Sequence, residues 1–545
     1  MKRLGYLAVA LAIALCACTK VATTQAGTGE RHSWTRPGVL RLANLTDPDN
    51  LSPLIGAYQI DVHLSMFWAG YLFNLDDKNA IVPELATEFP TLANGGISRD
   101  GRTITYHLRK GVTWQDGAPF GSDDVKFSWQ AVMNPNNNVQ SRVGYDIVSS
   151  IDTPDAATVV VHLKRAFAPF VSSFFTMGAT PFPVYPKHLL AKYPDLNRIP
   201  YNSKPVGTGP FIVQEWHRGQ TLRMIANPHY WRGAPKLREV QYRAIPDENT
   251  LTTGVKTHEL DLWFDASAAN YAAASKVPGT HAVLTPFTRF AILAFNNKRP
   301  IVSELPVRRA LALATDRKRM IETVTYGVNT LGEGDQPTFS WAHDAALKPL
   351  PFDPAQARAT LDAAGWKAGA DGIRVKNGQR LHLTFATTTG SATGTRTAVL
   401  LQAAWREIGV ELEVKQYLSA LMFAGFEAGG ILQAGKFDVA TLSWLNGVDP
   451  DDSTLFVCSN IPPHGYNQFR FCNADVDAQE RIALESNDQA VRKQAYAHIQ
   501  EALVDQVPEL TMWWVRQFDV VSDDLKNYKP AHTVTPFWNT WEYEI

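Results

Sequence analysis

The chain has 545 residues and a formal net charge of -1, with 45% hydrophobic and 19% charged residues. At roughly 100 to 200 residues per domain, this length predicts more than one domain, and the composition is that of a globular protein with a large core. The near-neutral charge balance argues against a nucleic acid as partner, because proteins that bind nucleic acids usually present a basic face.

The first eighteen residues have the pattern of a signal peptide. Lys2 and Arg3 precede an apolar run from 4 to 15, which is shorter than the roughly 20 residues that a transmembrane helix needs. The next residues, Leu15-Cys16-Ala17-Cys18, resemble a bacterial lipobox. We therefore predict a lipoprotein signal peptide at 1–18, lipidation of Cys18 and a polar tether at 19–35. The alternative is a plain secretory signal that is cut near Ala17.

The first half of the chain is predicted to consist of strands and short helices. Residues 103–108 alternate polar and apolar side chains, which is typical of a half-buried strand. Asp116-Gly117 predicts a turn, and Ser122 predicts the N-cap of the helix that follows. We expect a helix at 61–73 and further strands at 39–45, 158–163, 211–216, 221–226 and 239–245.

After residues 291–297 the pattern changes to alternating helices and strands, which is typical of an α/β domain. Asp353 and Pro354 predict the N-cap and the first position of a helix at 354–364. The other predicted helices lie at 307–326, 398–408 and 488–504, and the strands at 381–387, 410–417, 437–444 and 510–521.

Two cysteines remain once Cys16 and Cys18 are assigned to the export signal. In an exported protein, an isolated pair such as Cys458 and Cys472 predicts a disulfide bridge. Metal binding is the alternative, since His464 lies between them, but two thiolates without a second CxxC motif give too few ligands for a structural zinc site.

Four blocks of the sequence, in order, resemble one known family. They are LRKGVTWQDGAPFGSDDVKFSW at 108–129, GTGPF at 207–211 leading to NPHYW at 227–231, FNNKRPIVSELPVRRALALATDR at 295–317 and WLNGVDP at 444–450. This order is similar to that of the extracytoplasmic solute-binding proteins of family 5, the oligopeptide and dipeptide receptors of bacterial ABC importers.

The resemblance implies an α/β fold of the two-lobed periplasmic-binding-protein type II (cluster C), with an extra inserted domain in the first lobe. It also implies that strands near 291 and 515 join the two lobes as a hinge, with a ligand cleft between the lobes. On this basis we expect lobe I to comprise 36–60, 190–290 and 513–545, an inserted subdomain to comprise 61–189, and lobe II to comprise 291–512. The resemblance also implies an ABC transporter permease as partner, a lipid anchor at the cell surface or in the periplasm, and a monomer.

The segment 444–450 carries the expected ligand contacts. In peptide-binding relatives an Asp shortly after the Trp pairs with the free α-amine of the peptide, whereas here Asn446 or Gly447 holds that position. Asp449 is either the displaced anchor or the turn residue before Pro450. We expect Trp444, Asn446 and Asp449 to bind the ligand from one lobe, and Asp47 and Asp49 from the other; the alternative for Asp47 and Asp49 is a role in turns and caps.

Enzyme motifs give little support to a catalytic function. Residues 430–436 (GILQAGK) have P-loop spacing, but Phe437 stands where a Ser or Thr should hold magnesium. A secreted hydrolase that uses two carboxylates stays open as an alternative. We therefore predict a non-enzymatic receptor without a cofactor or a metal site that captures peptides. The further alternatives are a sugar or nickel-complex receptor and a module that reports to a sensor.

Overall fold

The structure is a computed structural model and describes residues 31–178 and 181–545. The predicted signal peptide, including Cys18, lies outside the described residues, as does most of the tether. No helix in the described part of the chain is long and apolar enough to cross a membrane.

A mixed sheet of 11 strands runs through the molecule. Ten of its strands follow the order β17-β16-β18-β11-β19-β10-β1-β9-β8-β7, and β12 pairs with β19 beside this path. The bounds are β1 Val39–Asn44, β7 Phe211–His217, β8 Thr221–Ala226, β9 Glu239–Ala244, β10 Leu262–Trp263, β11 Thr280–Phe295, β12 Thr330–Leu331, β16 His382–Thr388, β17 Glu411–Tyr417, β18 Val439–Leu445 and β19 Glu509–Ser522. The strands predicted in both halves of the chain are thus confirmed to within a few residues.

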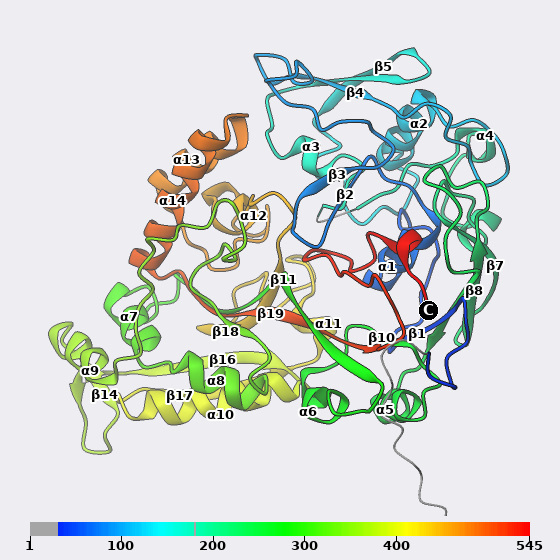
Figure 1. The fold of residues 1–545 in the computed structure, drawn as a ribbon. Helices are drawn as coiled ribbons and strands as arrows, with labels where there is room; N and C mark the ends of the chain where they lie inside the picture. The colour runs from blue at the N-terminus through cyan, green and yellow to red at the C-terminus, as the bar shows by residue number, and fades with distance from the viewer. Residues whose placement is uncertain (1–30, 179–180) are drawn as a thin grey trace, which may run out of the picture.

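Helices cover both ends of this sheet (Figure 1). The longer ones are α1 Gln59–Trp68, α2 Ser122–Met133, α5 Glu248–Lys256, α7 Leu305–Leu313, α8 Arg317–Val324, α9 Pro354–Ala363, α10 Ala392–Arg406, α13 Ala474–Glu485 and α14 Gln489–Gln506. Short helices are α3 Phe170–Ser173, α4 Lys187–Leu190, α6 Tyr271–Ala274, α11 Ser419–Met422 and α12 Ser453–Phe456.

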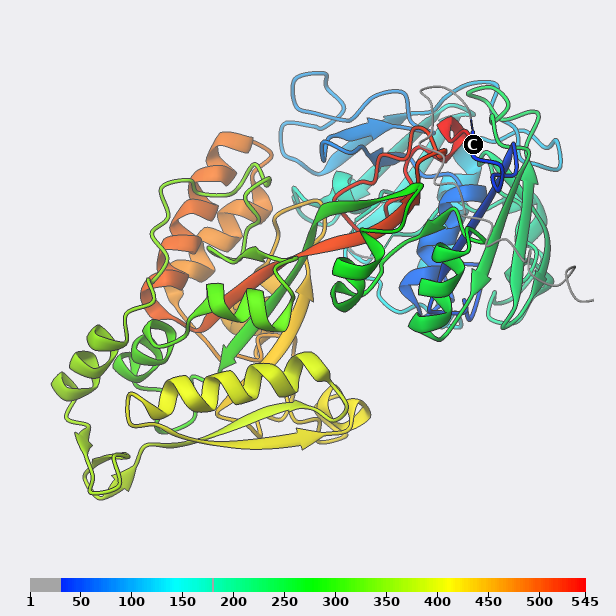
Figure 2. The ribbon, with the colours of Figure 1, turned by 60° about the horizontal axis from the view of Figure 1, so that its bottom comes forward.

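The apolar core divides into two bodies, which Figure 2 shows side by side. One body, here called lobe I, is built on β1, β7 to β10, α1 and the C-terminal residues to Ile545. The other, lobe II, is built on β16 to β18 and the helices from α7 to α14. The two bodies correspond to the two-lobed fold that the family resemblance implies.

Two neighbouring strands, β11 and β19, connect the lobes. They pair antiparallel from Thr280 with Ser522 to Ala294 with Glu509. The register shifts between Pro286 and Phe290, where the strands pass from the core of lobe I to that of lobe II. A break in register bends a strand pair locally, so this stretch is the natural hinge.

A second, three-stranded sheet lies in the segment expected to be an inserted subdomain. Its order is β4-β6-β5, with β4 Thr103–His107, β5 Val148–Asp155 and β6 Thr158–Leu163. Ile104 and Val161 of this sheet belong to the same apolar cluster as Leu40 of β1. The segment therefore packs as part of lobe I, and its standing as a separate subdomain stays a prediction. We call residues 87–173 around this sheet the inserted segment.

The GTGPF block packs against the end of helix α1. A Cβ atom at Gly207 would lie 1.8 Å from the carbonyl oxygen of Trp68, and one at Gly209 would lie 2.6 Å from its carbonyl carbon. The Gly209 N–H also donates a hydrogen bond to the Trp68 carbonyl at 2.9 Å. Only glycine permits this close backbone approach, which explains two glycines of the motif.

Three local predictions are corrected by the structure. Gly121, not Ser122, is the N-cap of α2, because the Ser122 hydroxyl donates to the Asp155 carbonyl instead. The helix predicted at 61–73 spans Gln59–Trp68. The helix predicted at 307–326 is two helices, since Asp316 accepts a hydrogen bond from the Arg319 N–H and caps a new helix, α8.

Cys458 and Cys472 form a disulfide bridge, with their Cα atoms 4.6 Å apart. The bridge closes a loop with a sequence separation of 14. We expect Cys458→Ser to lower the free energy of unfolding by about 3 kcal/mol, because the bridge restricts the unfolded chain. Urea denaturation measures this loss, and reducing the wild type should reproduce it. Equal stability of the oxidised and reduced wild type would contradict the prediction.

Candidate functional site

The segment 444–450 begins at the end of β18, directly beside the hinge. Trp444 pairs in register with Phe290 of β11, next to the break in register. The backbone N–H of Asn446 donates a hydrogen bond to the Thr288 carbonyl at 3.0 Å, which extends the pairing beyond the strand. The side chain of Val448 reaches the apolar cluster of lobe I. The segment thus leads from the hinge toward the opposite lobe.

Trp444 lines a hollow of about 470 Å³ in lobe II, here called the Trp444 hollow. Its aromatic walls are Phe423, Phe426, Trp444, His464 and Tyr466. The Trp444 and Tyr466 rings lie 5.8 Å apart, and Phe423 and Tyr466 are 58% and 52% exposed.

No Asp, Glu, Lys or Arg is among the 13 residues that line the Trp444 hollow. Exposed aromatic faces around an uncharged hollow suit a flat apolar group of a ligand, since such groups gain most from leaving water.

Asn446 is buried and holds the segment in place. Its side-chain amide donates to the Asp335 carbonyl at 3.1 Å. Nearby, the Gln336 amide donates to the Pro450 carbonyl at 2.9 Å and to the Asp335 carboxylate at 3.1 Å. The Asn446 side chain therefore holds the segment 444–450 against the loop at Asp335 in this structure.

Asp449 forms a bidentate ion pair with Arg492 of α14. The Nη1 of Arg492 donates to Asp449 Oδ2 at 2.9 Å, and Nη2 donates to Oδ1. The two side chains are only 9% and 11% exposed. Asp449 Oδ1 also accepts from the Asp451 N–H at 3.2 Å, as expected of a turn residue. The carboxylate is thus already compensated within lobe II.

Asp47 and Asp49 follow the carboxyl end of β1 in lobe I. Asp47 Oδ2 accepts a hydrogen bond from the Gly219 N–H at 2.9 Å, and Asp49 Oδ1 accepts from the Ala57 N–H at 3.1 Å. Burial, together with the nearby Asp49, raises the pKa of Asp61 to about 8. No hydrogen bond among the described residues joins Asp47 or Asp49 to the segment 444–450. Asp49 thus holds its own loop, whereas Asp47 makes a tertiary contact to the turn between β7 and β8.

A group of buried carboxyls near the segment 444–450 was not predicted from the sequence. Asp335, Asp452 and Glu480 are 1%, 0% and 0% exposed. Burial raises the pKa of Asp452 and of Glu480. The run of acidic residues at 449–452 was the one available signal. Within the described residues no group of three or more His, Cys, Asp or Glu side chains is arranged to hold a metal ion.

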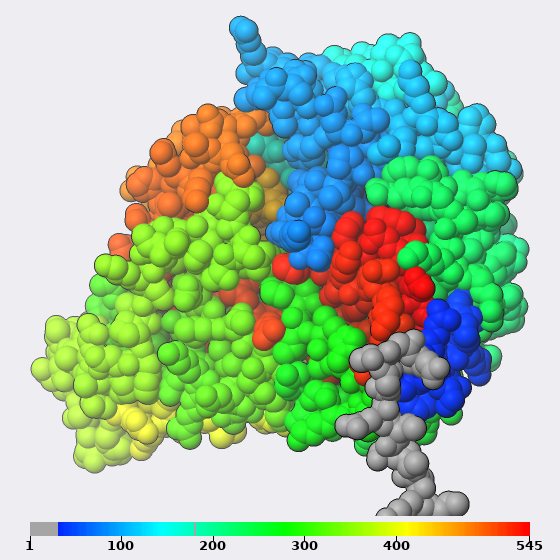
Figure 3. Space-filling model, viewed as in Figure 1, coloured from blue at the N-terminus to red at the C-terminus, as the bar shows by residue number. Residues whose placement is uncertain are grey.

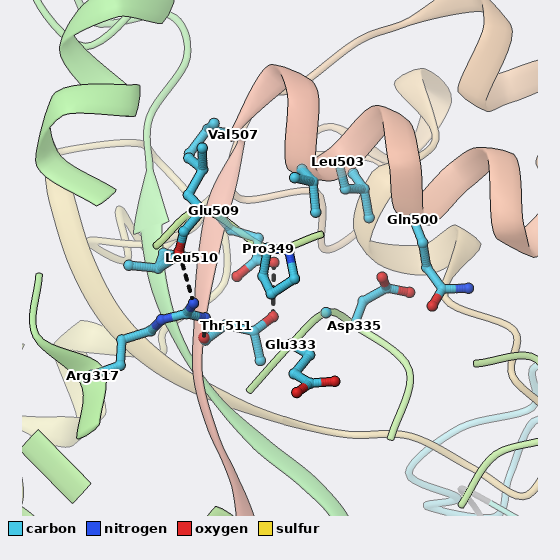
Figure 4. A pocket seen from close by; sticks show the side chains of 13 residues that line it. Arg317, Glu333, Asp335, Pro349, Gln500, Leu503, Val507, Glu509, Leu510 and Thr511 are labelled. Carbon is cyan, nitrogen blue, oxygen red and sulfur yellow. Dashed lines mark hydrogen bonds between the residues drawn. The ribbon is translucent and has the colours of Figure 1, made fainter. Parts of the chain in front are cut away.

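A small cavity of about 30 Å³ lies beside these carboxyls (Figure 4). Arg317, Asp335 and Glu509 point toward it from different elements of lobe II. Burial raises the pKa of Glu509 to about 8. A cavity of this size has room for only one or two water molecules, so it is a buried polar site and too small for a peptide or sugar.

Comparisons with known proteins point to one family. Residues 80–460 match the model for "Bacterial extracellular solute-binding proteins, family 5 Middle". Protein XP55 of Streptomyces lividans is 30% identical over 84% of this chain and 80% of its own length. The oligopeptide-binding protein AppA of Bacillus subtilis is 24% identical, over 95% and 94%. The crystal structure of NikZ from Campylobacter jejuni in complex with Ni(L-His) superposes with a TM-score of 0.75 at 23% identity, over 94% and 100%.

Proposed function

Because the chain belongs to family 5 of the bacterial extracellular solute-binding proteins, we propose that it is the substrate-binding receptor of an ABC importer and captures peptides between lobes I and II. Its fold is that of the type II periplasmic binding proteins of this family. The relatives are binding proteins, and we propose no catalytic role for this chain.

The observation that carries the proposal is the Trp444 hollow. It presents an uncharged aromatic surface next to the hinge, where closure of the lobes would remove a bound side chain from water. The relative AppA is named an oligopeptide-binding protein, which supports a peptide as the ligand. Mass spectrometry of molecules that co-purify with the mature protein tests the proposal; recovery of peptides supports it, and recovery of another solute class alone contradicts it.

Trp444→Ala should weaken binding of the co-purified ligand by roughly 2 kcal/mol, about thirtyfold, because a central aromatic contact is lost. Titration calorimetry measures the loss. Phe352→Ala is a matched control, since Phe352 is 52% exposed in the same lobe but does not line the Trp444 hollow. Unchanged affinity of the Trp444 variant, with the fold intact by circular dichroism, would place the ligand elsewhere.

We propose that the other four predicted site residues act on the ligand indirectly. Asn446 and Asp449 shape the segment that meets the ligand, and Asp47 and Asp49 shape the facing loop of lobe I. Since Arg492 already neutralises Asp449, we propose that Asp449 acts on the ligand through the position of this segment and not as a free amine anchor.

A metal chelate is the second candidate ligand. His464 lines the Trp444 hollow beside Tyr466, and a single imidazole can complete the coordination of a metal ion whose other ligands come from a small chelator. NikZ, which shares the fold, was solved with Ni(L-His). Calorimetry with the nickel–histidine complex, for the wild type and for His464→Ala, distinguishes this candidate from the peptide proposal.

We also propose that the mature protein is a monomer held at the outer surface of a membrane by a lipid on Cys18, where it meets the permease. The Leu15-Cys16-Ala17-Cys18 sequence supports the anchor. The intact mass of the membrane-extracted protein should show acyl groups on Cys18. An unmodified, soluble product that starts elsewhere would contradict this.

A further inference from the structure

The inserted segment of lobe I touches lobe II directly. The backbone N–H of Ala168 donates a hydrogen bond to the Leu484 carbonyl, at the end of α13, at 2.7 Å. Gly101 also lies against Asn487, since a Cβ atom at Gly101 would be 2.7 Å from its amide nitrogen. Figure 3 shows the surface of the inserted segment, in blue, adjoining the orange surface of α13 and α14. The lobes thus meet at a point far from the hinge.

A cavity of about 490 Å³ lies beside this contact. The inserted segment contributes Phe89, Leu92 and Val171 to its walls, and lobe II contributes Trp341, Val448 and Gln489. Ligand pockets typically measure roughly 300 to 1,000 Å³ and have mostly apolar walls. The cavity is therefore large enough for one or two bulky side chains.

The cavity offers no free charge to a ligand. Asp449 and Arg492 are the two ionised side chains among the 16 residues that line it, and they neutralise each other in the ion pair described above. A charged group would lose its hydration without gaining a partner, so the chemistry of the walls favours an uncharged apolar group.

The cavity and the Trp444 hollow are lined by the same short segment. Val448 and Asp449 line the cavity, and both belong to the segment that carries Trp444 at its other end. The four steps from Trp444 to Val448 span at most about 13 Å. A ligand of a few residues that lies along this segment could therefore reach both the Trp444 hollow and the cavity.

We propose that this cavity is a second subsite, which takes an uncharged apolar group of a ligand whose other end lies in the Trp444 hollow. Because its walls come from both lobes, a ligand that fills it would also favour their closed arrangement. This inference rests on the proposed function for the presence of a longer ligand, but the cavity can be tested without one.

The test uses 5-fluoroindole, an uncharged apolar probe, and ¹⁹F NMR on the full mature protein. Gln489→Trp places a large side chain in the cavity from the first residue of α14, and Ala490→Trp is the control, since Ala490 is the next position, is also exposed and does not line the cavity. The wild type and Ala490→Trp should bind the probe alike, and Gln489→Trp should lose one site or at least tenfold in affinity. Identical binding by all three proteins would overturn the subsite.

A second experiment tests whether the subsite contributes to peptide binding. The wild type, Leu92→Glu and Val143→Glu are each incubated with a tryptic digest of casein, and retained peptides are identified by mass spectrometry. Leu92 lines the cavity, whereas Val143 is 71% exposed in the same segment and does not. Leu92→Glu should lose the apolar peptides that the wild type and Val143→Glu retain. Retention of no peptide by the wild type would contradict the proposed function, and the 5-fluoroindole result would still decide on the subsite.

Discussion

Replacing Asp449 by Asn is expected to lower the free energy of unfolding by about 3 kcal/mol, because it leaves the buried charge of Arg492 without a partner. Both side chains are about one-tenth exposed, so water cannot replace the lost carboxylate. The Nε of Arg492 is also fixed by the Ala483 carbonyl at 2.8 Å, which prevents the guanidinium from swinging out to solvent. Urea denaturation gives the loss directly.

Two variants complete this experiment. Arg492→Met in the Asp449→Asn background removes the orphaned charge and should recover part of the stability, so the double-mutant cycle isolates the pair. Glu411→Gln is the control, since its ion pair with Arg380 is over 40% exposed on both sides and should cost less than about 1 kcal/mol. If Asp449→Asn cost no more than Glu411→Gln, the Asp449–Arg492 pair would not be formed in solution.

Glu509 is expected to make the protein less stable as the pH rises from about 5 to about 9. Burial raises the pKa of Glu509 from 4.5 to about 8, and the nearby Asp335 adds to the increase. A group whose pKa is raised in the folded state gives its full stability below the pKa of the unfolded state, and loses it as the pH rises through the folded value. Each pKa unit is worth about 1.4 kcal/mol, so the loss from this one group is up to about 4 kcal/mol.

Glu509→Gln tests this pH dependence, because glutamine keeps the shape of the side chain and cannot ionise. Its free energy of unfolding should match that of the wild type near pH 5 and exceed it near pH 9. Glu322→Gln, an exposed position of α8 in the same lobe, should leave the wild-type profile unchanged. An equal pH profile for Glu509→Gln and the wild type would show that Glu509 is ionised in the folded protein at neutral pH.

Local sequence signals predicted the elements of the fold well. Asp353 accepts from the Gln356 N–H at 2.8 Å and caps α9 as expected, and β6 has the predicted bounds. The prediction at Ser122 was wrong because a tertiary hydrogen bond to Asp155 took its hydroxyl. A cap is a local signal, but its competitor lies 33 residues further along the chain.

The site was harder to predict than the fold. A sequence motif identified Trp444 as a candidate ligand contact. The residues around it, however, come from separate loops near 423 and 465. The partner of Asp449 is 43 residues away on α14, and no periodicity or spacing connects them. The buried carboxyls likewise resemble ordinary surface acids in the sequence, because their burial depends on how loops pack over lobe II.

The disulfide bridge also connects the proposed ligand site to the redox state of the surrounding compartment. Cys458 and Cys472 bracket the loop that supplies His464 and Tyr466 to the Trp444 hollow. In the reducing cytoplasm this loop would lack its covalent closure, since such bridges form and persist outside it. The loop that forms one wall of the Trp444 hollow would then be held in place only by non-covalent contacts. On the proposed function, the protein would therefore gain its full affinity for the ligand only after export.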